Sequence, residues 1–422
     1  MTDKLAIDGG QKAVPDELVK VPWPVITDDD VSAVCAALRS GHIWGNAPNV
    51  VALEKEWANY CGVQHCHGTN GGTAALHMAL AGTGVGAGDE VLVPAYSFHS
   101  SASCILHQNA IPVFVDIDLA TFTIDPEKIR EKITTKTKAI IAVDLFGLPA
   151  NWDAINKIAK KNGLATIEDG CQAHGAAING KKTGSLAEVA AFSLNGSKNL
   201  PGAEGGLLVT DDEGIFEQSR ILEMAVQIVE GKRVYPAYTF GWNYRMNELS
   251  AALTRSRLKS LDELNAARKQ NCEYLSAELT KLDGLIPPHV PGGFTHVYHM
   301  YRVRLDPSLG EKYKMPMPEI KNGIMYALNS EGVATSTWVT DTLPHQGIYT
   351  ALRGYGNGCP WTCPHGSGVK REYAIEAYPS ALQLVETTFN VEYFYPPNGR
   401  TYIEAVVHGF QKVWEHLDTI FG

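Results

Sequence analysis

The stretch FSLNGSKNLPGAEGGLLVT, residues 192–210, decides how the rest of this chain is interpreted. Lys198 follows a short apolar run and small polar residues, and a glycine-rich segment leads into a second apolar run. This arrangement is typical of a lysine that an enzyme uses to hold an aldehyde cofactor as a Schiff base. Most lysines are solvated surface residues, but a position between a buried strand and a glycine-rich turn disfavours that alternative.

Short apolar runs alternate with helical segments from about residue 50 to residue 230. The runs are EVLVP (90–94), PVFVDID (112–118), AIIAVDL (139–145), ATIED (165–169), VAAFSL (189–194) and GLLVT (206–210). Runs that are apolar on both faces suit strands buried between layers of helices. The sequence therefore predicts an α/β fold with a mostly parallel sheet that is covered on both faces.

The pattern changes after residue 245. Residues 246–284 contain no proline and no interior glycine, and they predict one long helix or two nearly continuous ones. A strand over 296–305 and helices near 318–331 and 401–418 complete a smaller mixed domain, and the Gly-, Pro- and Cys-rich residues 340–372 predict a long loop. We therefore place a large domain with an N-terminal arm at 1–260 and a small domain at 261–422.

The composition limits the class of protein. With 422 residues, 45% of them apolar and 19% charged, the chain suits a globular enzyme. A net charge of -10 argues against a nucleic-acid surface. No apolar run approaches the roughly 18 residues of a membrane helix, and MTDKLAIDGG has no signal-peptide core, so we expect a cytoplasmic protein without a membrane segment.

Cysteine and histidine clusters raise the alternative of a metal site. The eight cysteines are scattered, which favours free thiols over a disulfide framework. HCH (65–67) and CPWTC (359–363), which is followed by His365, could contribute metal ligands. Adjacent side chains diverge, and neither cluster has a second half with the spacing of a zinc site. We therefore expect no metal.

An acid and a phosphate-binding segment accompany the lysine. Asp169 ends the run ATIED, at the sheet edge where α/β proteins bind ligands; a helix cap is the alternative. Glu168 should point to the opposite face. Gly72 and Thr73 begin the helical segment TAALHMAL, where free amides and the helix dipole favour a phosphate, and the Ser193 hydroxyl could join them.

These three parts match the requirements of pyridoxal phosphate (PLP), which needs an amine, an acid facing its pyridine nitrogen and a phosphate cup. A desolvated lysine has a lowered pKa and acts as a nucleophile and a base. No G-x-G-x-x-G follows a predicted strand, which disfavours a dinucleotide cofactor. The sequence therefore predicts a PLP enzyme whose catalytic residues are Lys198 and Asp169.

Seven blocks, in order, resemble the fold-type I PLP aminotransferases of the DegT/StrS group, which aminate keto-sugars and keto-cyclitols. They lie between about residues 25 and 305 and read NGGTAALHMAL, PAYSFHSSA, PVFVDID, IEDGCQAHGA, FSLNGSKN, GAEGGLLVT and GWNYRMNELSAAL. The resemblance implies a mostly parallel, seven-stranded type of sheet between helices, a smaller C-terminal α/β domain, and a homodimer with shared active sites.

The resemblance also implies how the cofactor ring is held. Lys198 would form the Schiff base and move the proton, and Asp169 would pair with the pyridine nitrogen. Gln172 would contact the phenolic oxygen. Phe98 would stack on the ring, where a core aromatic residue is the alternative.

The phosphate and substrate contacts follow from the same resemblance. Gly72, Thr73 and Ser193 would hold the phosphate. Asn243, which by its own sequence is only a turn or cap residue, would reach the phosphate of the neighbouring subunit.

Glutamate or glutamine would donate the amino group, and a keto-sugar, in particular a nucleotide-linked one, or a keto-cyclitol would accept it. Arg245 is expected to bind the donor carboxylate, with a surface salt bridge as the alternative. Trp44 and His299 are expected to line the acceptor pocket.

The chain departs from the group in several places, among them Gly170 and Cys171, which stand where alanines are usual. Asp144 stands where many members that act on sugar nucleotides have histidine, and TTFNVEYFYPP replaces a Ser-Leu-Pro signature, whereas GCPW (358–361) is similar to members that aminate cyclitol ketones. Two alternatives stay open. One is a PLP-dependent sugar dehydratase of the same fold, in which histidine commonly replaces the lysine, and the other is a non-catalytic regulator that keeps the PLP fold.

Overall fold

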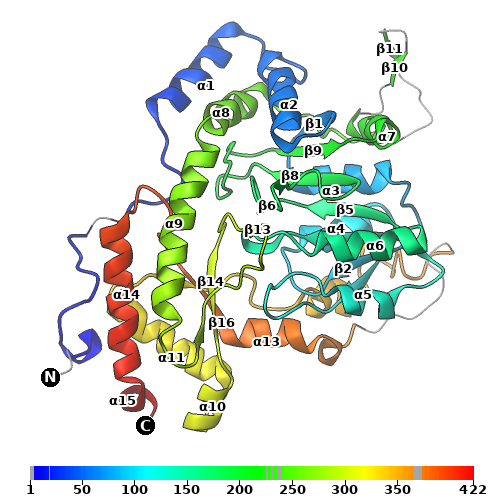
Figure 1. The fold of residues 1–422 in the computed structure, drawn as a ribbon. Coiled ribbons are helices and arrows are strands. Elements are labelled where there is room, and N and C mark those ends of the chain that lie inside the picture. Colours follow the sequence, from blue (N-terminus) through cyan, green and yellow to red (C-terminus); the bar gives the residue numbers. More distant parts are fainter. Residues whose placement is uncertain (1–3, 19, 225–226, 230–231, 235–239, 365–372) are drawn as a thin grey trace.

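The computed structural model describes residues 4–18, 20–224, 227–229, 232–234, 240–364 and 373–422. Its main sheet contains β1 (His65–Thr69), β2 (Glu90–Pro94), β3 (Ile111–Val115), β4 (Thr137–Val143), β5 (Ala165–Asp169), β8 (Val189–Ser193) and β9 (Gly206–Thr210). The seven strands lie in the order β1-β9-β8-β5-β4-β2-β3. Figure 1 labels β1, β9, β8, β5 and β2 of this sheet. Within this sheet, β9 runs antiparallel to its neighbours β1 and β8, and the other pairs are parallel. The mostly parallel sheet predicted from the sequence is confirmed.

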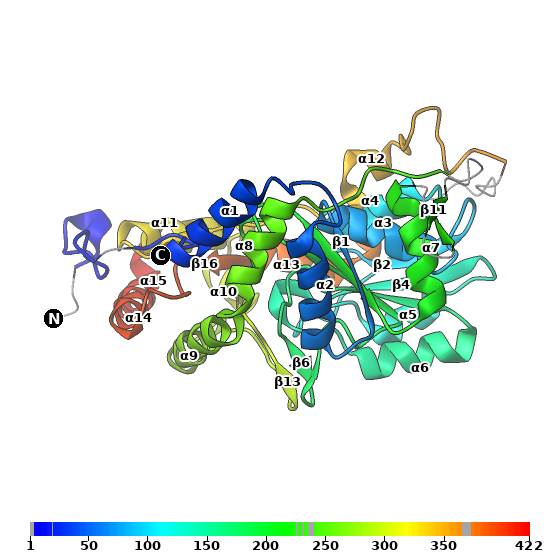
Figure 2. The same cartoon turned by 90° about the horizontal axis from the view of Figure 1, so that it is seen from above.

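Helices cover both faces of this sheet because successive side chains of a strand point to opposite faces. In β4, Ile141 packs into one helical layer and Ile140 into the other. One layer contains α3 (Gly72–Gly82), α4 (Ser100–His107) and α7 (Glu213–Met224). The other layer contains α2 (Pro48–Cys61), α5 (Pro126–Lys132), α6 (Trp152–Asn162) and α8 (Glu248–Leu258). Figure 2 shows α5 and α6 on the opposite side of the sheet from α3 and α4.

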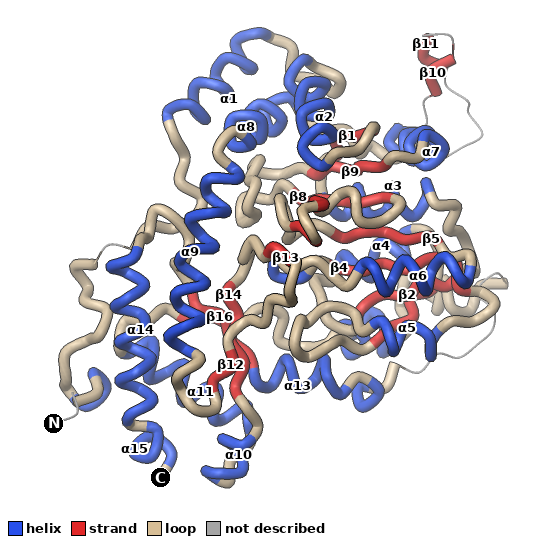
Figure 3. Tube along the Cα trace, viewed as in Figure 1, coloured by secondary structure: helices blue, strands red, loops and turns tan. Residues whose placement is uncertain are grey.

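The segment 246–284 forms two helices, α8 and α9 (Leu261–Leu279), which is one of the two forms expected. A second core lies beside α9 and contains a small antiparallel sheet (Figure 3). Its strands are β12 (Leu285–Ile286), β14 (Tyr301–Leu305), β15 (Thr335–Ser336) and β16 (Thr388–Val391), in the order β12-β14-β16-β15. The helices α11 (Met317–Ser330), α14 (Arg400–Glu415) and α15 (Leu417–Phe421) pack around it.

The strand predicted over residues 296–305 is wrong in its first half. β14 begins only at Tyr301. The preceding residues turn toward the large sheet, because the Val297 amide donates to the Gly147 carbonyl at 3.0 Å and the Met300 amide donates to the Phe146 carbonyl at 3.3 Å. These bonds join the two cores next to the end of β4.

The second core contains residues from both ends of the sequence. Leu5 and Val14 of the N-terminal arm are buried in the second core, and Glu331 accepts a hydrogen bond from the Ala13 amide at 3.0 Å. The ammonium of Lys412 lies 2.8 Å from the same carboxylate. A domain boundary at residue 260 stays a proposal. The N-terminal arm, which we assigned to the large domain, packs in the second core.

The segment after β15 returns to the large sheet. It includes short helical turns at Leu343–His345 and at α12 (Gly347–Thr350), where a long loop was predicted. Tyr349 and Trp361 are buried in the first core, and the Trp361 indole donates to the Tyr373 hydroxyl at 2.9 Å. The predicted loop 340–372 also contains residues 365–372, which lie outside the described residues.

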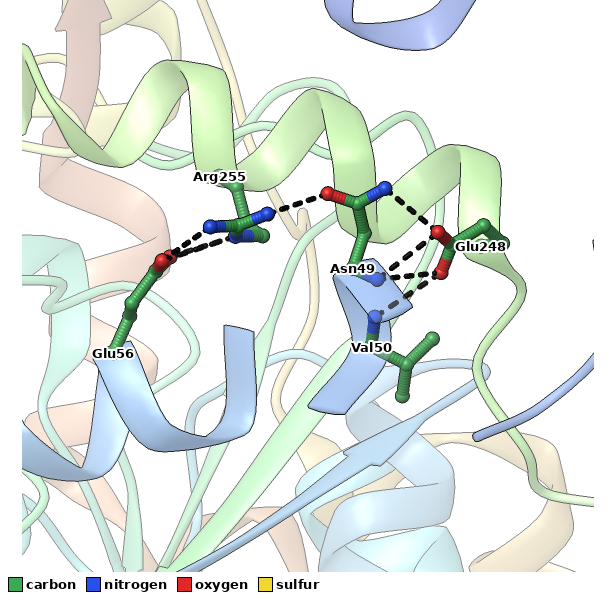
Figure 4. Close-up of polar contacts among 5 residues, drawn as sticks. All are labelled: Asn49, Val50, Glu56, Glu248 and Arg255. Carbon is green, nitrogen blue, oxygen red and sulfur yellow. Dashed lines mark hydrogen bonds and ion pairs between the residues drawn. The ribbon is translucent and has the colours of Figure 1, made fainter. Parts of the chain in front are cut away.

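A polar network fixes α8 against the start of α2 (Figure 4). The Glu248 carboxylate accepts from the backbone amides of Asn49 (3.0 Å) and Val50 (3.1 Å), which have no partner inside the first turn of α2. Arg255, two turns further along α8, pairs with Glu56 at 2.5 Å and donates to the Asn49 side chain at 2.6 Å. The segment that precedes α8 lies beside β1, where Arg245 forms an antiparallel bridge with Thr69.

Candidate active site

A cavity of ≈370 Å³ opens where β5 and β8 end. Its volume lies in the range of about 300–1,000 Å³ that is usual for cofactor and ligand sites. Among its lining residues are eight that the sequence singled out: Gly72, Thr73, Phe98, Asp169, Gln172, Ser193, Lys198 and His299. Residues from five separate segments of the sequence therefore converge on one space.

Lys198 lies in the connection between β8 and β9, two strands that pair with Ser193 opposite Gly206. Backbone hydrogen bonds close this connection, from Leu194 N–H to the Gly205 carbonyl at 2.8 Å and from Lys198 N–H to the Asn195 carbonyl at 2.9 Å. The Trp23 indole donates to the Lys198 carbonyl at 2.9 Å. The lysine backbone is thus fixed, while its Nζ has no hydrogen-bond acceptor among the described residues.

The environment of Lys198 favours the neutral amine. Burial lowers the pKa of Lys198, and the Cys171 and Asp169 side chains oppose this shift only in part. A larger fraction of the amine is therefore unprotonated near neutral pH than for an exposed lysine. An unprotonated amine is the form that attacks a carbonyl carbon.

Asp169 is the buried last residue of β5. The Ser101 hydroxyl donates to its Oδ2 at 2.7 Å, and the Cys171 amide donates to its Oδ1 at 3.2 Å. Glu168 points away, as expected, and accepts from the amides of Gly184 (2.8 Å) and Leu186 (3.2 Å). The Asp169 carboxylate is therefore held in one orientation at the edge of the cavity, where a protonated ring nitrogen could pair with it.

Gln172 and Phe98 shape the rest of the cavity wall. The Gln172 Oε1 accepts a hydrogen bond from the Phe146 amide at 2.8 Å, which leaves its NH2 group available as a donor. Phe98 is 51% exposed and forms part of the cavity wall. It is not the core residue that was the alternative for this position.

The start of α3 forms a compact anion cradle. The backbone amides of Gly72 and Thr73 precede the first intrahelical bond and have no acceptor among the described residues. A Cβ at Gly72 would lie 2.8 Å from the Ser193 Cβ and 2.9 Å from the Cys171 sulfur. The close packing of the start of α3 against Ser193 and Cys171 therefore requires glycine at position 72. The Thr73 hydroxyl donates to Ser100 at 2.8 Å. Free amides and hydroxyl groups at a helix N-terminus fit a phosphate, so the residues present fit PLP.

His299 lies in the same cavity, on the loop that joins the two cores. Its Nδ1 is out of contact with solvent and has no partner among the described residues. Burial holds the pKa of His299 well below its ordinary value, and the charge of Lys198 adds to this shift. The ring is therefore neutral and can both donate and accept a hydrogen bond.

Three residues predicted from the sequence do not line this cavity within one chain. Trp44 is 59% exposed and contacts His42. Asn243 is exposed, and its carbonyl accepts from the Asn70 side chain at 3.0 Å. Arg245 lies against Gly45, and its guanidinium is 3.7 Å from the Met224 sulfur. No described carboxylate forms an ion pair with Arg245, so the surface salt bridge considered for it is not observed.

Other cavity residues were not singled out from the sequence. Ser101 lies inside the quoted block PAYSFHSSA, and its place at the start of α4 was a signal that could have identified it. Met300 and Trp338 also line the cavity, and both pack against the first core. Neither has a local sequence signature, because only long-range packing brings them there.

The two cysteine–histidine clusters do not converge. In β1, Cys66 is buried in the core on one face, whereas His67 stacks on Phe216 with ring centroids 4.1 Å apart. Within the described part of the chain, no group of three His, Cys, Asp or Glu side chains could hold a metal ion, and the eight cysteines are free. His365 lies outside the described residues.

Comparison with known proteins places this site in a family. The sequence model of the DegT/DnrJ/EryC1/StrS aminotransferase family matches residues 24–365. GDP-perosamine synthase of Caulobacter vibrioides is 40% identical over 261 residues, which are 62% of this chain and 70% of that protein. L-glutamine:2-deoxy-scyllo-inosose aminotransferase of Streptomyces lividus is 36% identical over 323 residues, which are 72% of this chain and 75% of that protein.

The fold of this chain also matches that of a solved structure. The crystal structure of NtdA from Bacillus subtilis with bound cofactor PMP has a TM-score of 0.77 and 26% identity, and the match covers 95% of this chain and 87% of that one. The family match spans most of the chain, and the cavity with Lys198, Asp169 and the α3 amides lies within it. This chain is therefore a member of the DegT/DnrJ/EryC1/StrS aminotransferase family and a PLP-dependent aminotransferase.

Proposed function

We propose that this protein transfers an amino group from glutamate or glutamine to the ketone carbon of a keto-sugar or keto-cyclitol. The observation that carries the proposal is the presence of Lys198, Asp169 and the free amides of α3 in one cavity. The names of two relatives, one for a GDP-linked sugar and one for an inosose, support the acceptor class.

Each proposed role follows from the position of a side chain. Bound PLP supplies a ring that stabilises negative charge at the substrate carbon. Lys198 Nζ removes the proton from the α-carbon of the donor and, in the second half of the reaction, delivers a proton to the acceptor carbon that gains nitrogen. Asp169, oriented by Ser101, holds the pyridine nitrogen in its protonated form.

The remaining cavity residues position the reactants. The Gly72 and Thr73 amides and the Ser193 hydroxyl bind the phosphate, and the Gln172 NH2 group donates to the phenolic oxygen. Phe98 covers the ring on its open side and limits the access of water. These roles rest on the contacts and exposures described above and on the family resemblance.

We further propose that two copies of this chain form a homodimer that completes each site. Large apolar side chains are exposed on two segments that meet where Gly45 packs against Arg245: Ile43 and Trp44 on one segment, and Phe240, which is 91% exposed, and Trp242 on the other. Exposed apolar side chains gathered in one region are typical of an interface. Asn243 and Arg245 belong to the same region and would serve the partner's site, Asn243 at the phosphate and Arg245 at the donor carboxylate.

We also propose that the enzyme works in the cytoplasm. No helix in the described ranges combines the length and apolar character needed to cross a membrane. Trp44 and His299 are proposed to contact the acceptor, Trp44 from the partner subunit and His299 from within the same chain.

The decisive experiment follows the donor half-reaction by the absorbance of the bound cofactor. Glutamine or glutamate should change the spectrum of the holoenzyme, and a suitable ketone should restore it. Lys198→Ala should abolish both changes, whereas Lys181→Ala, an exposed lysine outside the cavity, should behave as the wild type. A spectrum that no amino donor alters would favour the regulator, and loss of a sugar hydroxyl without amine formation would favour the dehydratase.

A further inference from the structure

The N-terminal arm contacts the main chain of the catalytic lysine. The Trp23 indole donates to the Lys198 carbonyl at 2.9 Å. Trp23 lies in the part of the arm between Val14, which is buried in the second core, and α1 (Asp28–Ser40). It does not line the cofactor cavity. A residue outside the cavity therefore holds the backbone of the residue that carries the reactive amine.

Two buried guanidinium groups fix the ring of Trp23. Those of Arg268 and Arg257 lie 4.8 Å and 5.2 Å from the ring centroid. Arg257 also pairs with Asp30 of α1 at 2.9 Å. The Nε and Nη1 of Arg268 have no hydrogen-bond partner among the described residues, so this cation depends on the rings of Trp23 and Tyr395, the second at 5.9 Å. A desolvated cation over an aromatic face is strongly attracted, so the indole cannot turn away without a cost.

The main chain of the arm is tied down on both sides of this ring. Upstream, the Val21 amide donates to the Asn398 Oδ1 at 3.0 Å, and the Asn398 side-chain amide donates to the Val21 carbonyl at 2.9 Å. Downstream, the Arg257 guanidinium donates to the Val25 carbonyl. Residues 21–25 therefore form a strap that is fixed at one end to the segment after β16 and at the other end to α8.

The lysine loop is held from its other side as well. The Asn199 side chain donates to the Asn265 Oδ1 of α9 and to the Val297 carbonyl, both at 3.0 Å. Since Lys198 Nζ has no acceptor among the described residues, its direction depends on the peptide that carries it. A small rotation of this peptide is amplified at the end of a long side chain, and a displacement of about 1 Å can slow a reaction by about 100-fold.

We propose that Trp23 is a positioning residue for Lys198 and that the strap sets the direction in which the lysine amine enters the cavity. The proposal rests on the proton-transfer role proposed above for Lys198. It adds a residue that touches neither the cofactor nor the substrate and that acts through the backbone of Lys198 alone.

Trp23→Phe keeps an aromatic ring for Arg268 and removes the N–H donor. The rate constant of the donor half-reaction at saturating donor should fall by about tenfold, while the dissociation constants of PLP and of the donor stay within about twofold. The primary isotope effect with an α-deuterated donor should rise, because proton transfer by Lys198 is the step that slows. A purely structural defect would not increase this isotope effect.

Trp414→Phe is the matched control. The Trp414 indole also donates to a backbone carbonyl, that of Asp283 at 2.8 Å, but from α14 and outside the cavity. This variant loses the same kind of hydrogen bond and should keep the wild-type rate and isotope effect. Equal rate losses in the two variants, or a wild-type rate in Trp23→Phe, would overturn the proposal.

Asn398→Ala tests the strap with Trp23 left in place. It removes both hydrogen bonds to Val21 and should slow the same half-reaction. If Asn398 acts through Trp23, the double variant should be no slower than the slower single variant, because the two changes break one line of contacts. Rate losses that multiply in the double variant would contradict the strap. Should Trp23→Phe not fold, a wild-type rate in Asn398→Ala would also count against it.

Hydrogen exchange of the full-length apoenzyme supplies a measurement without cofactor or donor. The amides of Lys198 and Gly202 donate within the loop, to the carbonyls of Asn195 (2.9 Å) and Leu194 (2.7 Å). They should exchange at least about tenfold faster in Trp23→Phe than in the wild type or in Trp414→Phe. If no donor alters the wild-type cofactor spectrum, the proposed function fails, but exchange still decides whether the strap holds the loop. If the half-reaction proceeds and exchange is unchanged, only the positioning proposal fails.

Discussion

The Ser101 hydroxyl donates a 2.7 Å hydrogen bond to the Asp169 Oδ2, from the first turn of α4 to the end of β5. Ser97 contacts the same hydroxyl at 2.9 Å. Both serines are buried. A carboxylate that faces a ring nitrogen must keep one orientation, and Ser101 is the residue that fixes it from the helix side.

Replacement of Ser101 by alanine should slow catalysis. A hydrogen bond to a charged group contributes about 1.5–3 kcal/mol, so kcat should fall by about tenfold or more if the bond orients Asp169. Stopped-flow measurement of the donor half-reaction checks this. Ser103→Ala, on the same helix and without a contact to Asp169, is the control; equal rates for the two variants would contradict the role of Ser101.

A methyl group at Gly72 should weaken cofactor binding. Because its Cβ would lie 2.8 Å from Ser193 and 2.9 Å from Cys171, Gly72→Ala must displace the start of α3 from the phosphate site. The expected result is a rise in the dissociation constant of PLP by at least about tenfold, measured by fluorescence titration of the apoenzyme. Gly347→Ala, where a Cβ meets nothing within 4 Å, should bind PLP normally.

Asp144 and Glu168 form a buried pair of acids next to Asp169. The Asp144 amide donates to the Asp169 carbonyl at 3.0 Å, and its Oδ1 accepts from the Ala150 amide (2.8 Å) and the Trp152 indole (3.0 Å). Burial, helped by the Glu168 carboxylate, holds the pKa of Asp144 well above its ordinary value. Burial therefore favours the protonated form of Asp144, whose Oδ2 has no hydrogen-bond partner among the described residues.

Asp144→Asn should keep this arrangement, since an amide also presents one acceptor and one donor. A group whose pKa is raised by folding stabilises the folded state at low pH, and this contribution is lost as the pH rises through the folded-state pKa. The variant should therefore lose less stability than the wild type between pH 6 and pH 9 in urea unfolding. Asp153→Asn, an exposed aspartate on α6, should follow the wild type. A steeper loss in Asp144→Asn would contradict the raised pKa of Asp144.

Glu54 of α2 gives a second pH dependence, away from the site. It accepts from the Gly68 amide at 2.8 Å, and burial raises the pKa of Glu54 from 4.5 to about 7. Its stabilising contribution is complete below pH 4.5 and is lost as the pH rises through about 7. Glu54→Gln should therefore gain about 1–3 kcal/mol over the wild type at pH 8 and about nothing at pH 5, as measured by the free energy of unfolding. Glu17→Gln, which is exposed, should show no such difference.

The sequence predicted the part of the site that consists of local motifs. Asp169 ends one strand and Lys198 follows another, the apolar run of each strand is visible in the sequence, and parallel strands bring their ends to one edge. Gly72 begins a helix with an obvious pattern. Such residues are recognisable because their local conformation alone determines where they lie, and the structure places them in one cavity.

The remaining parts depend on long-range packing. β1 carries the polar sequence HCHGT and was not recognised as a strand, because it pairs with β9 alone at the edge of the sheet and has no continuous apolar run. Met300 and Trp338 lie far from the other cavity residues in the sequence and reach the cavity by packing against the first core. The first half of the strand predicted over 296–305 is instead held by Phe146 and Gly147, a contact that no periodicity reveals.

The packing of the N-terminal arm affects the order in which the second core can form. Leu5 and Val14 emerge from the ribosome long before α14, yet all three belong to the same core. During synthesis Leu5 and Val14 cannot complete their packing until α14 has been released from the ribosome. All strands of the large sheet are available before that point. Folding of this protein should therefore end with the second core. The N-terminal arm, which carries Trp23, should pack against it late.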